Sequence, residues 1–497
     1  MMKTTFLLLA AALFAAASGP PDTTEKPAAR LVDVREYMLS NGLKVLIVED
    51  KSAPQVVCRL YFKVGSTYEN PGKTGLSHML EHMMFKGTRK IGVANFEKEQ
   101  AFVRPIDSLF RLSDAALDRG DTAAFTARRQ EAMALTEKQR AYMKNNELWA
   151  LYQKEGGTDL NAWTSDYITA YIVTLPSNKL ELFCWLESDR MANPVMREFY
   201  PERDVVMEER RLRYENSPYG RYWESLAALV FEAHPYRIPT IGYMNDLRHL
   251  TMDDAFNHFK KHYTPNNAVL VLAGDIRRQE AMALVTRYFG TIPPGPNVAG
   301  PVSGEPEQAG QKRLIVKKNV GPRLDILFKT PALGDKDAFP FDVMEGVLSG
   351  KSGGLYKKLV LEKKLATAVT ASHQAQKWIS TFVVSADLVQ GVDPAAAERA
   401  VFNELARLRD TPVTERELEK VKNNVMAAQV NGLRTNEGLS DRLAWFEVCD
   451  TWRLINRYAD EVKAVSPAAV REAARKYLTE KNSTVGWVVN EGKGGAQ

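Results

Sequence analysis

Hydrophobic and polar residues recur with different periods along the chain, and these periods predict a protein of mixed α and β structure. Two apolar runs flank Asn41-Gly42, a dipeptide that favours a tight turn, so we expect a β-hairpin there. Leu76, Met79 and Met83 fall instead at helical spacing. The same reasoning predicts strands at 55–65, 158–165, 167–175 and 267–275, and helices at 180–191 and 253–263.

The second half of the chain again has strands followed by a helix, which predicts two domains of similar size. Residues 313–330 contain two strand patterns, and residues 341–350 have a helical one. Residues 291–310 are rich in proline and glycine and poor in apolar side chains, as in a linker. We therefore predict an N-terminal domain over 31–290 and a C-terminal domain over 311–492, both of α+β class.

One stretch of the first domain does not fit this pattern. Residues 104–150 are almost all helix formers, interrupted at Gly120-Asp121. This composition predicts a helical hairpin inserted into the domain. Two interpretations of the hairpin remain open, a solvated spacer arm and a docking arm for a partner.

Composition narrows the class of protein. The chain has 497 residues, of which 45% are hydrophobic and 26% charged, so it can bury sizeable cores. Its formal charge of +5 is spread along the sequence without a dense Lys/Arg block, and we expect no nucleic-acid partner. The three cysteines, Cys58, Cys184 and Cys449, are too few for a disulfide framework and are expected to be buried thiols.

The first residues resemble a targeting segment. Lys3 precedes the apolar run 6–16, and Ala15-Ala16-Ala17 offers a cleavage site for a signal peptide over residues 1–17. No later segment reaches the length of about 18 apolar residues that a membrane span needs. We expect an exported chain with no integral membrane segment after cleavage, most simply periplasmic; an extracellular chain or one held by an uncleaved anchor is the alternative.

The predicted helix at 76–84 contains the candidate metal-binding and catalytic residues. His78, Glu81 and His82 form the motif H-x-x-E-H. Residues at i and i+4 lie one above the other on a helix, so both imidazoles can point at one metal ion. Glu81 projects beside that face, where a carboxylate can bind a metal-bound water. Two ordinary surface histidines are the plain alternative, but the apolar residues around them indicate a packed helix.

Catalytic zinc sites use three protein ligands and leave one position for water. The expected helix after Pro201 supplies the third ligand, because Glu209 sits among apolar neighbours whereas Glu208 points to solvent. Glu202, two turns earlier, is expected to orient a histidine; a first-turn acid stabilised by the helix dipole is its alternative. The stripe expected to face the core consists of Glu202, Val205, Val206, Glu209 and Leu212.

A second histidine pair, His258 and His262, also has i, i+4 spacing. No glutamate lies between the two residues, and Lys260 and Lys261 disfavour a cation. We expect these histidines on the surface of their helix.

Several motifs together resemble a known family. GLSHMLEHMMFKGT, GGTDLNAWTSDYITAY, ERDVVMEE, HPYRIPTIG and YTPNNAVLVLAGD follow the order found in the pitrilysin/insulinase family of inverted-motif zinc peptidases. The chain is similar to the shorter members, such as the mitochondrial processing peptidase β subunit and its bacterial relatives. Glu209 follows His82 at a longer distance than in the family, and the helical insertion accounts for the excess.

The resemblance implies two related α+β halves, each with a mainly antiparallel sheet, that close a peptide chamber with the two halves of a partner. It also implies that 156–164 is an edge strand to which the substrate backbone adds, with Asn161 and Ala162 at the binding positions. By spacing alone, a plain half-buried strand is equally consistent. Where family members often carry an Arg and a Tyr in the second half, this chain has Gly354 and Ala368. That departure favours a heterodimer with a metal-free relative over a homodimer.

The combined interpretation is an exported zinc endopeptidase acting on peptides or unfolded segments. One Zn²⁺ per chain is held by His78, His82 and Glu209, and Glu81 moves the proton. The alternative is a subunit that binds peptides or supports an assembly without cutting. A zinc hydrolase of non-peptide amides is a third interpretation, which the edge-strand motif makes weaker.

Overall fold

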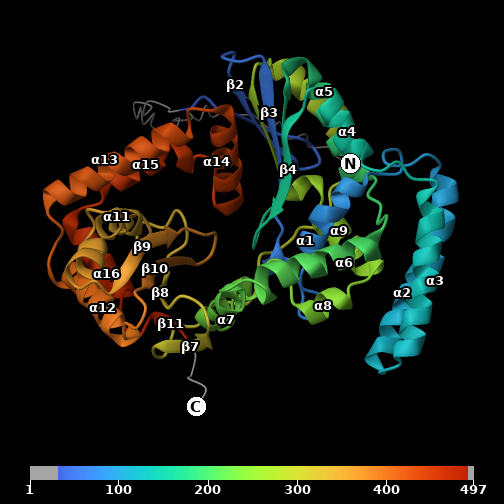
Figure 1. The fold of residues 1–497 in the computed structure, drawn as a ribbon. Helices are drawn as coiled ribbons and strands as arrows, with labels where there is room; N and C mark the ends of the chain where they lie inside the picture. Colours follow the sequence, from blue (N-terminus) through green and yellow to red (C-terminus); the bar gives the residue numbers. More distant parts are fainter. Residues whose placement is uncertain (1–31, 491–497) are drawn as a thin grey trace, which may run out of the picture.

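The first half of the chain is built on a six-stranded sheet. The computed structural model describes residues 32–490, so the predicted signal peptide lies outside the described residues. The strands follow the order β1-β2-β6-β3-β5-β4 across the sheet (Figure 1). Their bounds are β1 Arg35–Met38, β2 Lys44–Glu49, β3 Gln55–Phe62, β4 Thr158–Thr164, β5 Thr169–Pro176 and β6 Ala268–Gly274.

The second half is built on a five-stranded sheet with the order β7-β11-β8-β10-β9. Its strands are β7 Lys312–Lys318, β8 Arg323–Thr330, β9 Ala366–Gln374, β10 Ser380–Leu388 and β11 Ser483–Asn490. The segment between the last helix of the first half and β7, which contains the proposed linker 291–310, has no regular secondary structure.

The two sheets share one topology once the edge strand β1 is set aside. β2 pairs in parallel with β6, as β7 does with β11, and every other pairing in both sheets is antiparallel. The fold is therefore α+β with two related halves, as predicted, although the repeat is not visible in the sequence.

Helices cover both sheets. In the first half they are α1 Leu76–Met83, α2 Phe96–Asp118, α3 Thr122–Arg140, α4 Glu147–Lys154, α5 Leu180–Ala192, α6 Phe199–Arg210, α7 Gly220–Val230, α8 Met244–Arg248, α9 Met252–His262 and α10 Arg278–Phe289. In the second half they are α11 Phe339–Leu348, α12 Pro394–Asp410, α13 Glu415–Gly432, α14 Asn436–Cys449, α15 Leu454–Ala464 and α16 Pro467–Tyr477.

The predicted β-hairpin forms at the start of the first sheet. Met38 of β1 pairs with Lys44 of β2, and Gly42 adopts φ +86° in the loop between them, a conformation that glycine favours. Central strands such as β3 are buried over nearly their whole length, because helices cover one face of the sheet and the other half of the chain approaches the opposite face.

The two halves contact each other through α14 of the second half, which packs on β3 and β6 of the first. Nε of Arg59 donates a 2.6 Å hydrogen bond to Asp441, and Nζ of Lys44 is 2.5 Å from Glu447. These ion pairs between β-strands of one half and a helix of the other fix how the halves sit.

The inserted hairpin consists of α2 and α3 and begins earlier than the predicted residue 104. The chain reverses at Gly120, with φ +77°, and the Asp121 side chain caps α3 by accepting from the amide of Ala124 at 2.9 Å. Phe110 of α2 stacks on Tyr200 of α6 at 4.3 Å between ring centroids. The hairpin is therefore packed on the domain rather than freely solvated.

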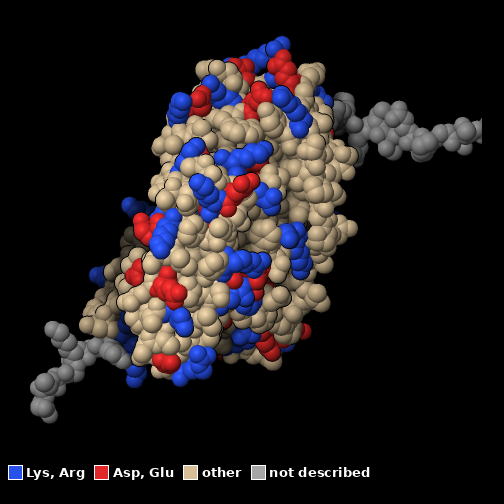
Figure 2. All heavy atoms as spheres, turned by 90° about the vertical axis from the view of Figure 1, so that its right-hand side faces the viewer, with Lys and Arg blue, Asp and Glu red and all other residues tan. Residues whose placement is uncertain are grey.

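Charges on the face that carries the hairpin are of both signs and interspersed (Figure 2). The three cysteines are buried and free, as expected. Among residues 32–490, every helix is too short or too polar to cross a membrane.

Candidate metal centre

Helix α1 is fixed at its start by a buried carboxylate. Glu69 accepts hydrogen bonds from the amides of Gly75 and Ser77, each at 2.6 Å, and so satisfies two donors at the helix N-terminus. Burial raises the pKa of Glu69 to about 7. The apolar face of α1 is buried in the core of the first half. His78 and His82 lie one turn apart on another face of the helix, edge to face, with ring centroids 4.9 Å apart.

The core-facing stripe of α6 differs from the predicted one. Val205 is 51% exposed and Leu212 61% exposed, so the prediction that both face the core was wrong. Arg203 and Arg210 are buried there instead, paired with Asp114 at 2.9 Å and with Glu224 at 2.6 Å. Buried arginines of this kind are tolerated because their charges are neutralised.

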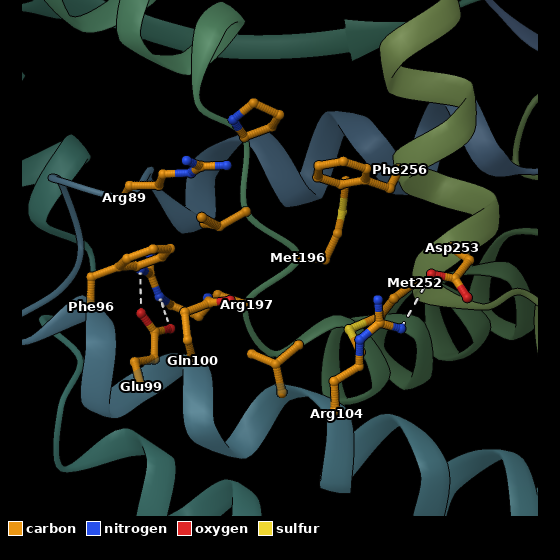
Figure 3. A pocket seen from close by; sticks show the side chains of 13 residues that line it. Arg89, Phe96, Glu99, Gln100, Arg104, Met196, Arg197, Met252, Asp253 and Phe256 are labelled. Atoms are coloured by element: carbon orange, nitrogen blue, oxygen red, sulfur yellow. Dashed lines mark hydrogen bonds and ion pairs between the residues drawn. The ribbon is translucent and has the colours of Figure 1, made fainter.

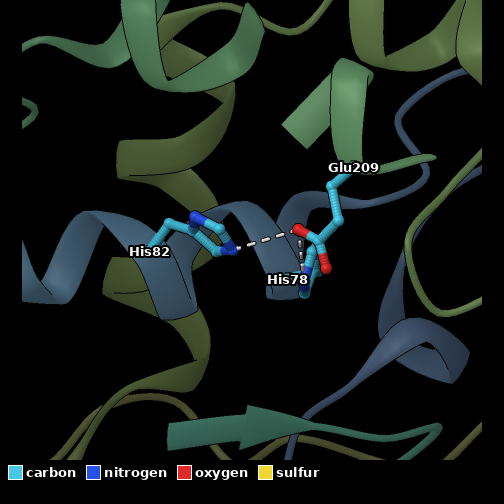
Figure 4. A group of neighbouring side chains, drawn as sticks. All are labelled: His78, His82 and Glu209. Atoms are coloured by element: carbon cyan, nitrogen blue, oxygen red, sulfur yellow. Dashed lines mark ion pairs between the residues drawn. The ribbon is translucent and has the colours of Figure 1, made fainter. Parts of the chain in front are cut away.

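Glu209 nevertheless reaches the histidines. Its Oε2 lies 3.7 Å from Nε2 of His78 and 3.5 Å from Nε2 of His82 (Figure 4). The other carboxylate oxygen of Glu209, Oε1, is 2.5 Å from the guanidinium of Arg213. Glu208 is exposed, as predicted.

The spacing of the three side chains fits one metal ion. One ligand atom from each of His78, His82 and Glu209 can be chosen so that all lie within 4.8 Å of one another. Atoms bound tetrahedrally to zinc at about 2.1 Å lie about 3.4 Å apart, close to the distances observed here. Two imidazoles and one carboxylate are also the donor set of catalytic zinc sites. The residues therefore fit the ion.

Glu202 lies beside the second histidine. Its Oε1 is 2.8 Å from Nδ1 of His82, and its Oε2 is 2.6 Å from Nζ of Lys86. Burial opposes ionisation of Glu202, but the hydrogen bonds to His82 and Lys86 outweigh it and lower the pKa to about 2. This contact holds Nδ1–H toward the carboxylate and leaves Nε2 free for a metal.

The electrostatics of the centre favour a cation. Burial lowers the pKa of His78 to about 4, so this imidazole is neutral and able to bind a metal. Burial acts in the same direction on His82, yet its hydrogen bonds to Glu202 and Glu209 raise the pKa to about 9. The carboxylates of Glu202 and Glu209 beside His82 therefore stabilise positive charge there.

Glu81 is held by the edge strand. The hydroxyl of Thr164, the last residue of β4, donates to Oε2 of Glu81 at 2.7 Å. Burial raises the pKa of Glu81, which makes its carboxylate a better proton acceptor near neutral pH. The other carboxylate oxygen is left for a proton.

Strand β4 is at the edge of the six-stranded sheet, as the family resemblance implies. Asn161 is exposed, and its Oδ1 accepts from the amide of Ala162 at 2.9 Å. The Ala162 side chain packs into the core, so only backbone groups of this residue face outward. The register of β4 on β5 shifts between Thr158 and Asn161.

Two family models match the chain. The model described as insulinase (peptidase family M16) matches residues 44–102, which include the whole H-x-x-E-H motif. The model described as peptidase M16 inactive domain matches residues 249–425. The chain is therefore similar to members of the insulinase (M16) family of peptidases in both of its halves.

Relatives within the family have known names or structures. The zinc protease PqqE of Helicobacter pylori is 27% identical over 456 residues, which cover 90% of each chain. A protease from Helicobacter pylori has a crystal structure with a TM-score of 0.77 and 25% identity, covering 92% of this chain and 100% of that one. The periplasmic protease PqqL of Escherichia coli has a TM-score of 0.68 at 18% identity, and the match covers 93% of this chain but 48% of PqqL. The fold of this chain thus resembles one half of PqqL.

Gly354 and Ala368, where the family resemblance leads one to expect an Arg and a Tyr, lie in different surroundings in the second half. A Cβ atom added at Gly354 would lie 1.9 Å from Oε1 of Glu404, so the position is closely packed. Ala368 is exposed on β9, the edge strand of the second sheet.

The second histidine pair is buried, and the prediction of a surface pair was wrong. His258 is 8% and His262 1% exposed. Nε2 of His258 is 3.1 Å from the hydroxyl of Ser77, and burial lowers the pKa of both histidines. Neutral imidazoles pack behind α1, while Lys260 on the same helix remains exposed.

Sequence reasoning missed Lys86, Thr164 and Arg213. Lys86 and Arg213 each follow a candidate ligand, His82 or Glu209, by four residues, and this spacing predicts a contact on a helix face. Thr164 has no local signal, because its contact with Glu81 depends on how the sheet meets α1.

A separate cavity of about 240 Å³ lies between α2 and α9, away from these residues (Figure 3). Phe96, Met196 and Phe256 provide apolar walls, and the ion pair of Arg197 with Glu99 lies at its side. That buried ion pair attaches the inserted hairpin to the segment that leads into α6.

Proposed function

We propose that this chain is an exported zinc-dependent endopeptidase that hydrolyses peptides or unfolded polypeptide segments. The observation that carries the proposal is the convergence of His78, His82 and Glu209 from two helices, with Glu81 beside them. Similarity to a peptidase family, and to a relative named a zinc protease, supports it. The apolar run before Ala17 supports export.

Glu81 is the general base and then the general acid. A bound zinc ion would polarise the scissile carbonyl and lower the pKa of the attacking water. Glu81 accepts one proton from that water as oxygen attacks the carbonyl carbon, and it returns the proton to the amine that leaves when the C–N bond breaks. Thr164 orients the carboxylate through Oε2.

The substrate adds to the free edge of β4. An extended peptide there forms backbone hydrogen bonds with the outward groups around Asn161 and Ala162, which holds its scissile bond near Glu81. Thr164 links this strand directly to Glu81. Because the captured segment must be extended, stably folded domains are excluded as substrates.

The active assembly requires a second chain. The match to only 48% of PqqL supports the view that this chain forms half of a chamber. The absence of larger side chains at Gly354 and Ala368 favours a metal-free relative as partner over a second copy of this chain. Light scattering and peptide hydrolysis, measured on the chain alone and after co-expression with relatives, distinguish the homodimer from the heterodimer. Full activity of a homodimer would refute the heterodimer.

The test of the proposed function is hydrolysis of a quenched peptide library by the full chain with its partner. We expect cleavage that a zinc chelator abolishes and added zinc restores, and no cleavage of a compact folded protein. Cleavage that survives complete metal removal would overturn the proposal.

A further inference from the structure

Lys86 lies between the candidate metal centre and the start of α6. It ends the short 3-10 turn Met84–Lys86 that follows α1. Its Nζ is 2.6 Å from Oε2 of Glu202 and 3.6 Å from Oε2 of Glu198. The other oxygen of Glu202 is 2.8 Å from Nδ1 of His82. The ammonium group of Lys86 therefore ties Glu202 of α6, and Glu198 just before α6, to the turn that follows the helix carrying both histidines.

Glu198 continues this chain of contacts to the inserted hairpin. Nε of Arg140, the last residue of α3, donates to Oε1 of Glu198 at 2.7 Å. Glu198 precedes α6 with φ +55°, a left-handed conformation that a residue with a Cβ atom rarely adopts. Its side chain is only 13% exposed, and both of its oxygens are in ion pairs. Arg140, Glu198, Lys86 and Glu202 thus form a continuous path to His82.

The hairpin contacts the same part of α6 at further points. The hydroxyl of Tyr200 donates to Asp107 of α2 at 2.5 Å, and Arg203 pairs with Asp114 of α2 at 2.9 Å. Arg129 of α3 pairs with Asp204. The hairpin is therefore attached along the first half of the helix that also carries Glu202 and Glu209.

We propose that Lys86 and Arg140 are positioning residues for the zinc site, and that the inserted hairpin is part of its support. The inference rests on the proposed function, because it takes zinc to be the ion bound. A carboxylate that accepts from the distal nitrogen of a ligating histidine fixes the ring, and its loss weakens metal binding about 10- to 100-fold. Lys86 holds that carboxylate in place, and Arg140 holds the Glu198 carboxylate that Lys86 also contacts.

The test is the rate at which full-length zinc-loaded protein transfers its zinc to a chromogenic chelator. We expect release about tenfold faster in Lys86→Met and about two- to threefold faster in Arg140→Met, with Lys86→Arg close to wild type. Arg128→Met is the matched control: Arg128 lies on the same helix and pairs with Glu131 three residues away, as Arg140 pairs with Glu137. Its release rate should not change.

Two further measurements separate positioning from general stability. The visible absorption of the cobalt-substituted protein should change in Lys86→Met, while the melting temperature of the metal-free protein should stay that of wild type. Glu198→Gly keeps the left-handed backbone but removes both ion pairs, so it should also release zinc faster.

Unchanged release from both Lys86→Met and Glu198→Gly would overturn the inference, as would equal acceleration in Arg128→Met. Failure of the wild-type protein to bind zinc would instead refute the proposed function, and this inference with it.

Discussion

Helices α1 and α6 of the first half face each other through two imidazoles and two carboxylates, whereas α11 and α13 occupy the corresponding places in the second half and pack directly. α11 follows β8 as α1 follows β3, and α13 is the second helix after β10 as α6 is after β5. A Cβ atom added at Gly346 of α11 would lie 2.4 Å from Cγ1 of Val421 in α13. Polar groups therefore occupy one interface, and close apolar packing the other.

This difference teaches that the shared fold supplies a place for a metal site without supplying the site. Among residues 32–490, the group of His78, His82 and Glu209 is the only one of its kind brought within metal-binding distance. The insertion also belongs to the first half alone: residues 84–157 separate α1 from β4, whereas 349–365 separate α11 from β9.

The largest expected effect comes from removing a carboxylate from the interface between α1 and α6. Glu209→Ala turns a site with three ligands into one with two, so the purified protein should lose nearly all of its zinc and its peptide hydrolysis should fall at least about 10³-fold. Glu208→Ala, one residue away and exposed, should keep both. Metal analysis of the two variants decides the assignment, and a zinc-loaded Glu209→Ala beside a zinc-free Glu208→Ala would reverse it.

A smaller effect is expected from overpacking the interface between α11 and α13. Gly346→Val places a branched side chain against Val421, and overpacking of this kind costs about 1–3 kcal/mol, of which better helix propensity returns less than about 1 kcal/mol. We expect a melting temperature lower by several degrees, with zinc content unchanged. Gly304→Val is the control, because no atom lies within 4 Å of a Cβ there. Loss of zinc from Gly346→Val would show that the two interfaces are not independent.

The smallest effect is expected at Val205 of α6 and at Leu212 in the turn after it, which were wrongly assigned to the core. Val205 and Leu212 are 51% and 61% exposed, so Val205→Ala and Leu212→Ala should each change the free energy of unfolding by less than about 0.5 kcal/mol. Denaturant unfolding measures this directly. A loss of about 2 kcal/mol or more would show that these side chains are packed in the core, as the sequence pattern predicted.

Most of the interface between α1 and α6 could be predicted, because residue spacing within each helix indicates which side chains lie together. The i, i+4 spacing of His78 and His82 and the apolar residues between them sufficed for α1, and the acid-rich helix after Pro201 sufficed for Glu202 and Glu209. The stripe of α6 was misjudged because helical spacing does not reveal that Arg203 and Arg210 are buried against Asp114 and Glu224, which lie on other helices.

Other features depend on contacts between segments far apart in the chain. The burial of His258 requires the Ser77 hydroxyl of α1 as its partner, and Thr164 meets Glu81 only when β4 is at the sheet edge. The repeat of the two halves is a repeat of strand order, which unrelated side chains can satisfy equally well.

The most direct test of the central claim is zinc content and peptide hydrolysis measured on the same preparation of Glu81→Gln. The amide keeps the shape of the side chain and its contact with Thr164 but cannot accept the proton, so the account predicts wild-type zinc with hydrolysis lower by about 10²- to 10⁴-fold. Glu81→Gln that binds zinc and still cleaves peptides at the wild-type rate would contradict the account.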